Sequence, residues 1–255
     1  MEEIKHHDLH QKEKGKFFNE QQSLFEKIYK NGFSNYVEDL ENLKLAFSSK
    51  DHCVCCIDEG TPNGPYHSAG SGILGKEEEV LEDFKKAGVT EITSHDGCGA
   101  AGLYTKAHEL DLAKADEYGK EWSKKIAAKL GVPYRHISSG EMSRPKEFHI
   151  ARVAYYDGTG KFDYSKVKEL PAGFIISRVI QTSGKSVSEA TLAFNIAIGD
   201  HGMGQLINKE NPFVIVAIGK NTEDLLKLMN ELEEVKRATH DQVKIDGFIA
   251  PEIKN

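Results

Sequence analysis

The most informative segment of the chain is Asp51-His-Cys-Val-Cys-Cys-Ile-Asp58. It is short and rich in β-branched and thiol side chains, and it is followed by Gly60, Pro62, Gly64 and Pro65. This pattern predicts a buried strand that ends in a loop. Side chains at the carboxyl end of a parallel strand often carry the chemistry of an α/β protein.

Strands and helices alternate along the rest of the chain. A helix over 76–87 precedes a strand over 89–94, which leads into the Gly-rich turn His95-Asp-Gly-Cys-Gly99 and a long helix to about Leu130. Such alternation implies parallel pairing through right-handed crossovers. Further strands are expected at 134–137, 149–156, 173–178, 212–219 and 243–249, helices near 186–206 and 222–240, and a hairpin turn at Asp157-Gly-Thr-Gly160.

The N-terminal part of the chain has a helical pattern in place of this alternation. Apolar residues recur at three- and four-residue steps from Phe17 to Phe47, which predicts two helices broken near Asn31-Gly32. We therefore expect a helical N-terminal extension over 1–50 and a single compact α/β domain over 51–255. The predicted fold class is α/β, with a mixed, mainly parallel central sheet flanked by helices.

Composition narrows the functional classes. The 255 residues are 39% hydrophobic and 29% charged, as in globular proteins, and the net charge of -7 argues against nucleic acid or an anionic membrane surface as partner. No apolar run is long enough to span a membrane, and no secretory signal is readable, so we expect a cytoplasmic protein. Three of the four cysteines crowd one strand, where neighbours are poorly placed for disulfides.

Four side chains form a candidate metal site. Along a strand, Cys56 and Asp58 project to the same face. His95 and Cys98 stand three residues apart across a Gly-rich turn at the end of a second strand. Each alone is more often structural, but together two thiolates and one imidazole suit zinc. Three protein ligands leave a fourth position open, as in catalytic zinc sites.

The same residues resemble a known family. Cys56-Ile-Asp58 and His95-Asp-Gly-Cys98-Gly-Ala100 resemble the C-x-D-x-R and H-x-x-C-G signatures of β-class carbonic anhydrases, and His67-Ser-Ala69-Gly70 resembles that class's Arg-x-Ala-Gly element. From about Asp51 onward the chain is similar to a narrower group, the limiting-carbon-dioxide-inducible B protein family of θ-class carbonic anhydrases. The segments that carry this likeness are 69–74, 94–100, 151–162 and 198–202.

The resemblance implies a reaction and roles. It implies reversible hydration of carbon dioxide to bicarbonate by zinc-bound hydroxide, with Cys56, His95 and Cys98 as zinc ligands. Asp58 would accept a hydrogen bond from the hydroxide and position it. The backbone N–H groups of Gly99 and Ala100 would donate to the developing carboxylate oxygens. A homodimer is expected, again from the resemblance alone.

One position departs from the family pattern. Gly60 stands where the family has an arginine that pairs with the aspartate, so Asp58 is expected to be free to become a fourth zinc ligand and close the site. Three alternatives would keep such a site active. We expect first that another cation, such as His67, Lys76 or Arg152, folds onto Asp58; the others are that Glu59 or the backbone substitutes for the arginine, or that the substrate is another small heterocumulene. Several histidines are candidates for proton relay because imidazole titrates near neutral pH, namely His52, His67, His149 and His201.

Two alternative functions follow. One is hydrolysis of carbonyl sulfide or carbon disulfide on the same scaffold. The other is a bicarbonate-sensing or structural relative in which Asp58 completes a closed zinc site. A nucleotide-binding domain is disfavoured because Ala69-Gly-Ser-Gly does not match the dinucleotide or P-loop spacing.

Overall fold

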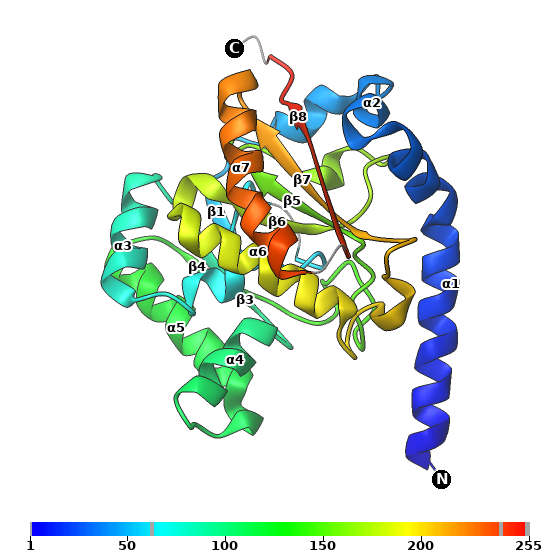
Figure 1. Ribbon diagram of the computed structural model, residues 1–255. Coiled ribbons are helices and arrows are strands. Elements are labelled where there is room, and N and C mark those ends of the chain that lie inside the picture. The colour runs from blue at the N-terminus through cyan, green and yellow to red at the C-terminus, as the bar shows by residue number, and fades with distance from the viewer. Residues whose placement is uncertain (1, 62–63, 240–241, 253–255) are drawn as a thin grey trace.

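A computed structural model describes residues 2–61, 64–239 and 242–252. Its strands form two four-stranded sheets in which every pairing is parallel, with strand orders β2-β1-β3-β4 and β6-β5-β7-β8 (Figure 1). The strands are β1 Cys53–Cys55, β2 Tyr66–His67, β3 Glu91–His95, β4 Tyr134–Ile137, β5 Val153–Asp157, β6 Phe174–Ser177, β7 Phe213–Gly219 and β8 Val243–Ile249. The α-helices are α1 Glu2–Asn31, α2 Phe33–Glu38, α3 Glu77–Lys86, α4 Gly99–Ala107, α5 Ala115–Leu130, α6 Ser183–Ile198 and α7 Thr222–Ala238.

The two sheets meet through their edge strands. β2 and β6 are neighbours, and the backbone N–H of His67 donates to Ser177 Oγ at 2.8 Å. The backbone N–H of Ile175 in β6 donates to the carbonyl of Ile57, just past β1, at 3.3 Å. The carboxyl ends of β1 and β3, where the candidate metal ligands lie, therefore sit close to the second sheet.

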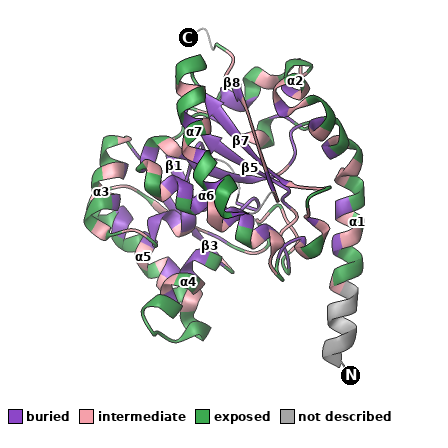
Figure 2. Ribbon diagram, in the orientation of Figure 1, coloured by how far each residue is buried: buried purple, intermediate pink, exposed green. Residues whose placement is uncertain are grey.

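Helices cover both faces of the second sheet. Its strands are buried from end to end in β5 and β7, so both faces need apolar partners (Figure 2). On one face Tyr156 and Ile215 pack with residues of α6 and α7. On the other, Tyr155 and Val216 pack with residues of α1 and α2. The N-terminal helices thus complete one of the hydrophobic cores.

The α/β class is confirmed, and several details differ from expectation. The sheets are entirely parallel rather than mixed. The turn at Asp157–Gly160 is not a hairpin, because β5 and β6 run parallel; the buried Asp157 carboxylate instead accepts hydrogen bonds from the backbone N–H groups of Thr159 and Gly160. The long helix expected up to Leu130 is interrupted between α4 and α5 by a short 3-10 turn at Leu112–Lys114.

Most remaining elements fall near their expected places. Helices α3, α6 and α7 overlap the expected segments, and β4, β6, β7 and β8 lie within a residue of theirs. The first strand is shorter than expected and ends at Cys55, while β5 begins at Val153 rather than at His149. Within the described residues, no helix combines the length and apolarity needed to cross a membrane.

Candidate metal centre

Cys56, His95 and Cys98 come together at the ends of two neighbouring strands. Cys56 follows β1 directly, His95 is the last residue of β3, and Cys98 caps the start of α4. Because β1 and β3 pair in parallel, their carboxyl ends lie at the same edge. One ligand atom from each residue lies within 4.8 Å of the other two, and all three residues are buried.

The donor atoms fit a zinc ion. The Sγ atoms of Cys56 and Cys98 are 4.0 Å apart, close to the spacing of about 3.8 Å for two sulfurs bound tetrahedrally to zinc. His95 Nδ1 lies 2.9 Å from the carbonyl oxygen of Asp96, which assigns the proton of the neutral ring to Nδ1 and its lone pair to Nε2. That Nε2 is buried and has no hydrogen-bond partner among the described residues. A metal ion bound by the two thiolates would take this nitrogen as a ligand.

The three ligand side chains shift one another's pKa values because they are buried and close together. The hydrogen bond shared with Cys98, together with burial, raises the pKa of Cys56. The same hydrogen bond lowers the pKa of Cys98, helped by the backbone N–H groups at the start of α4. Burial disfavours the charged form of His95, but Cys56 and Asp58 raise its pKa to about 9. Metal binding must therefore displace protons from this site.

Arg144 is the cation that pairs with Asp58. Its Nε donates to Asp58 Oδ1 at 2.7 Å and its Nη2 to Oδ2 at 2.8 Å, and each side chain is only 6% exposed. Burial raises the pKa of Asp58, but the Arg144 hydrogen bonds and nearby positive charges hold it well below its usual range. The expectation that Asp58 is free to close the metal site is therefore wrong, because a bidentate guanidinium occupies both of its oxygens.

Gly60 explains how this arginine reaches the site. A Cβ built on Gly60 lies 2.6 Å from Arg144 Cγ, which is too close for a side chain there unless the arginine moves, and it lies 3.1 Å from Asp58 Oδ1, which is a tight contact. The Gly60 N–H also donates to Asp58 Oδ1 at 2.8 Å. The missing side chain at position 60 thus makes room for an arginine that arrives from the loop between β4 and β5.

The expectation that another cation pairs with Asp58 is confirmed by Arg144, but none of the three residues named for this role is there. The ring nitrogens of His67 lie 2.6 Å from the carbonyl oxygen of Cys56 and 2.7 Å from that of Gly64, so its ring is fixed beneath the first ligand. Lys76 is exposed and pairs with Glu79, while Arg152 is buried under α1. Sequence reasoning missed Arg144 because it lies 86 positions from Asp58 with no local signal.

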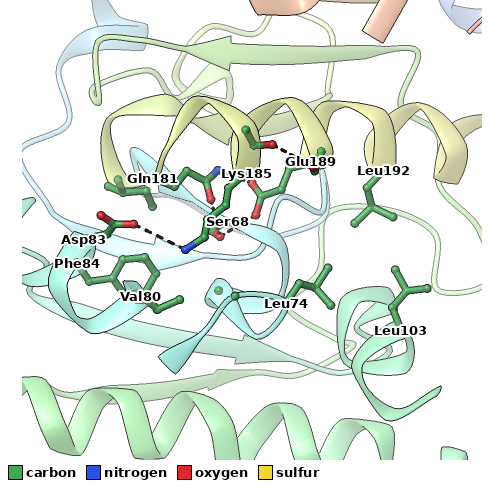
Figure 3. A pocket seen from close by; sticks show the side chains of 15 residues that line it. Ser68, Leu74, Val80, Asp83, Phe84, Leu103, Gln181, Lys185, Glu189 and Leu192 are labelled. Carbon is green, nitrogen blue, oxygen red and sulfur yellow. Dashed lines mark hydrogen bonds and ion pairs between the residues drawn. The ribbon is translucent and has the colours of Figure 1, made fainter. Parts of the chain in front are cut away.

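The turn after β2 supports the first ligand. The backbone N–H of Gly70 donates to Cys56 Sγ at 3.2 Å, and the turn before it is held by a buried carboxylate on α6. Glu189 Oε1 accepts from Ser68 Oγ at 2.8 Å and from the Ala69 N–H at 2.7 Å. Figure 3 shows Ser68, Gln181 and Glu189 converging beside a cavity of about 390 Å³. This carboxylate positions the backbone that contacts Cys56.

A second cavity of about 550 Å³ opens beside the metal cluster. One part of its wall is apolar and includes Ile57, Phe174 and Leu192. Gly99, whose N–H begins α4, also lines it. The polar wall carries Asp58, Arg144, His149 and His201, so two of the histidines expected as relay candidates reach this cavity and His67 is not among its lining residues.

Asp58, Glu59 and His149 form a second cluster of ligand-type atoms, all within 4.8 Å of one another. Each of the three side chains is held by at least one hydrogen bond or ion pair. Arg144 holds Asp58, while Glu59 accepts from the Ile150 N–H at 2.9 Å and pairs with His149 at 2.7 Å. This group is an ion-pair network at the cavity wall.

Comparison with known proteins identifies no relative. No protein-family model matches the chain, and neither a curated protein nor a solved structure matches it. The functional assignment therefore depends on the site.

Proposed function

We propose that this protein catalyses the zinc-dependent, reversible hydration of carbon dioxide to bicarbonate, as its resemblance to β- and θ-class carbonic anhydrases implies. The observation that carries the proposal is the buried Cys56–His95–Cys98 cluster beside the Asp58–Arg144 pair, at one side of a partly apolar cavity. Zinc, when bound, supplies a Lewis acid that lowers the pKa of water and provides a nucleophile near neutral pH.

Asp58 acts as a hydrogen-bond acceptor in this scheme. Its depressed pKa keeps it ionised, so it accepts hydrogen bonds and does not donate them. Oδ1 already accepts from both Gly60 and Arg144, whereas Oδ2 accepts from Arg144 alone and retains capacity for a further bond. Asp58 Oδ2 therefore orients the attacking water oxygen, and Arg144 keeps the carboxylate in place.

The rest of the cavity suits the substrate and product. Carbon dioxide has no net dipole, and the apolar wall of Ile57, Phe174 and Leu192 offers it a dry surface. Gly99 and Ala100, at the N-terminus of α4, line the cavity, and the Ala100 N–H is engaged by Cys98. The Gly99 N–H is the donor that we assign to the negative charge developing on the oxygens of bicarbonate.

The Asp58–Arg144 pair also bears on the alternatives. A closed, non-catalytic site needs Asp58 as a fourth ligand, and the bidentate arginine opposes that arrangement. Hydrolysis of carbonyl sulfide would take place in the same cavity, so only assays with each substrate distinguish it from the hydration of carbon dioxide. A homodimer remains part of the proposal from the resemblance, and analytical ultracentrifugation tests it.

Stopped-flow hydration of carbon dioxide tests the function. We expect the zinc-loaded protein to be active, and Asp58→Asn and Arg144→Gln each to lose about a hundredfold in kcat/KM at unchanged zinc content. Carbonyl sulfide is assayed in parallel. Zinc-loaded protein that hydrolyses carbonyl sulfide but does not hydrate carbon dioxide contradicts the proposal in favour of the other substrate.

A further inference from the structure

A buried hydrogen-bonded pair, Glu59 and His149, has no role in the scheme above, and its histidine lines the cavity. Glu59 is 2% exposed, its Oε2 lies 2.7 Å from His149 Nδ1, and its Oε1 accepts from the Ile150 N–H at 2.9 Å. His149 follows a loop from the other sheet, and its side chain is 13% exposed at the cavity wall. Because the Glu59 carboxylate accepts a hydrogen bond from Nδ1, Nδ1 carries a proton. Nε2 then carries the lone pair in the neutral ring and the second proton in the charged ring.

We propose that the Glu59–His149 pair is the proton acceptor of this site, with His149 Nε2 receiving the proton that hydration releases and passing it to solvent. The inference rests on the proposed function. A C–O bond forms between water and carbon dioxide, one O–H bond of the water breaks, and the proton bonds to Nε2 before it leaves to a buffer base. In the dehydration direction the same atom supplies the proton.

The other titratable groups near the reaction are unsuited to this task. Asp58 is held ionised by Arg144, so it does not retain a proton near neutral pH. Both ring nitrogens of His67 lie at hydrogen-bond distance from backbone carbonyls, which leaves no atom to accept a proton from the cavity. His201 is exposed and makes its described contact with His149 through the backbone alone.

Position favours His149 in particular. A ring nitrogen of His149 lies within 4.8 Å of a carboxylate oxygen of Asp58, next to the group that orients the water. Nε2 makes no hydrogen bond among the described residues, and the ring packs against Phe174 of β6 at 5.5 Å between centroids. The imidazole is therefore fixed on the carboxylate side and open on the other.

The charges around His149 set the pH at which it works. Burial lowers the pKa of His149, but Glu59 and then Asp58 raise it, and Arg144 opposes them, so that it lies above the ordinary value for histidine. The remaining charged or titratable residues of the cavity lining are Cys56, Lys146, Glu147, Asp200 and His201. Because an acceptor must be unprotonated, hydration through His149 increases as the pH rises through this raised pKa.

A kinetic experiment separates proton transfer from attack on carbon dioxide. For zinc-loaded His149→Ala in dilute buffer we expect kcat to fall about a hundredfold, kcat/KM to stay within about threefold, and added imidazole to restore kcat. His108→Ala is the matched control, since His108 is an exposed histidine at the end of α4, away from the cavity. If the wild type is active and His149→Ala leaves kcat unchanged, the assignment of His149 is overturned and the proposed function stands.

A spectroscopic experiment provides a readout besides activity. In histidine-labelled protein, NMR titration should show His149 with a pKa above 6.5, and Glu59→Gln should lower it. Glu59→Gln should also move the alkaline rise of kcat to lower pH. An unshifted His149 titration in Glu59→Gln overturns the role of Glu59. A zinc-loaded wild type that hydrates no carbon dioxide overturns the proposed function, and this assignment with it.

Discussion

Gly60 and Arg144 act as one unit at the site. The arginine side chain fills the volume that a side chain at position 60 requires, with Arg144 Cγ only 2.6 Å from the built Cβ. The β-class carbonic anhydrases that the motif around Asp58 resembles place an arginine two residues after the aspartate. Here the guanidinium that pairs with Asp58 comes from the loop between β4 and β5.

We predict that Gly60→Ala displaces Arg144 from Asp58. The new methyl group should lower kcat/KM by at least about tenfold while zinc content stays at one per chain, because none of the three ligands touches position 60 in the described contacts. Metal analysis and stopped-flow kinetics measure both quantities. Gly102→Ala on α4 is the control, since nothing lies within 4 Å of a Cβ there. Unchanged kinetics in Gly60→Ala contradict this account of the arginine.

We predict that zinc affinity rises steeply with pH. In the metal-free site burial lowers the pKa of His95 but Cys56 and Asp58 raise it to about 9, and the pKa of Cys56 is also raised. Zinc requires both groups unprotonated, so protons compete with the metal below pH 9 and affinity increases about tenfold per pH unit for each displaced proton. Competition with a chelator of known affinity between pH 6 and 8 measures this slope. A flat profile contradicts it.

Among the elements, α6 supports the metal centre from behind. Glu189 reaches the turn at Ser68 and Ala69, and the next N–H along the chain, that of Gly70, donates to Cys56 Sγ. Gln181 Nε2 donates to the other oxygen of Glu189 at 2.6 Å. The helix therefore holds the turn through a carboxylate that accepts hydrogen bonds from three donors.

We predict that Glu189→Ala destabilises the protein. The substitution leaves three buried donors without their acceptor, at about 1–3 kcal/mol for each, and water entry offsets part of this, so a loss of about 3 kcal/mol is expected in urea unfolding. Zinc should also dissociate faster because the contact to Cys56 loosens. Glu189→Gln keeps the shape and an amide oxygen as acceptor, and it should lose less than half as much. Equal losses in the two variants contradict this role.

At the scale of the whole molecule, the N-terminal helices are part of a core. Phe25, Ile28 and Phe33 are fully buried against the sheet of β5 and β7. The guanidinium of Arg152 stacks on Phe18 at 3.8 Å and on Phe25 at 4.2 Å, which ties α1 to the residue before β5. The segment expected as a helical extension thus contributes buried side chains to the core on one face of the second sheet.

We predict that removing residues 1–50 prevents cooperative folding. Each buried aromatic or aliphatic side chain of this segment contributes about 2 kcal/mol, and the buried set includes Phe25, Ile28, Phe33, Val37 and Phe47. Their sum approaches the whole stability of an ordinary domain. Thermal unfolding of the shortened chain, followed by circular dichroism, should show no sharp transition. A cooperative transition near that of the full chain contradicts the integral role of these helices.

The sequence predicted the metal cluster better than its surroundings. Cys56, His95 and Cys98 could be grouped because ligand-type residues at the ends of two parallel strands must lie at one edge. Arg144 could not be placed, because its contact with Asp58 depends on a long loop path that no local pattern encodes. The division into two sheets could not be predicted either. The first sheet ends at β2, and this strand has only two residues, too few to show a hydrophobic periodicity in the sequence.

The most direct test of the central claim is to titrate zinc into metal-stripped protein while recording the rate of carbon dioxide hydration. The rate should rise linearly and level off at one zinc per chain, and Cys98→Ser should show neither stoichiometric binding nor the rate increase. Binding of one zinc at Cys56, His95 and Cys98 with no hydration at any pH would contradict the account.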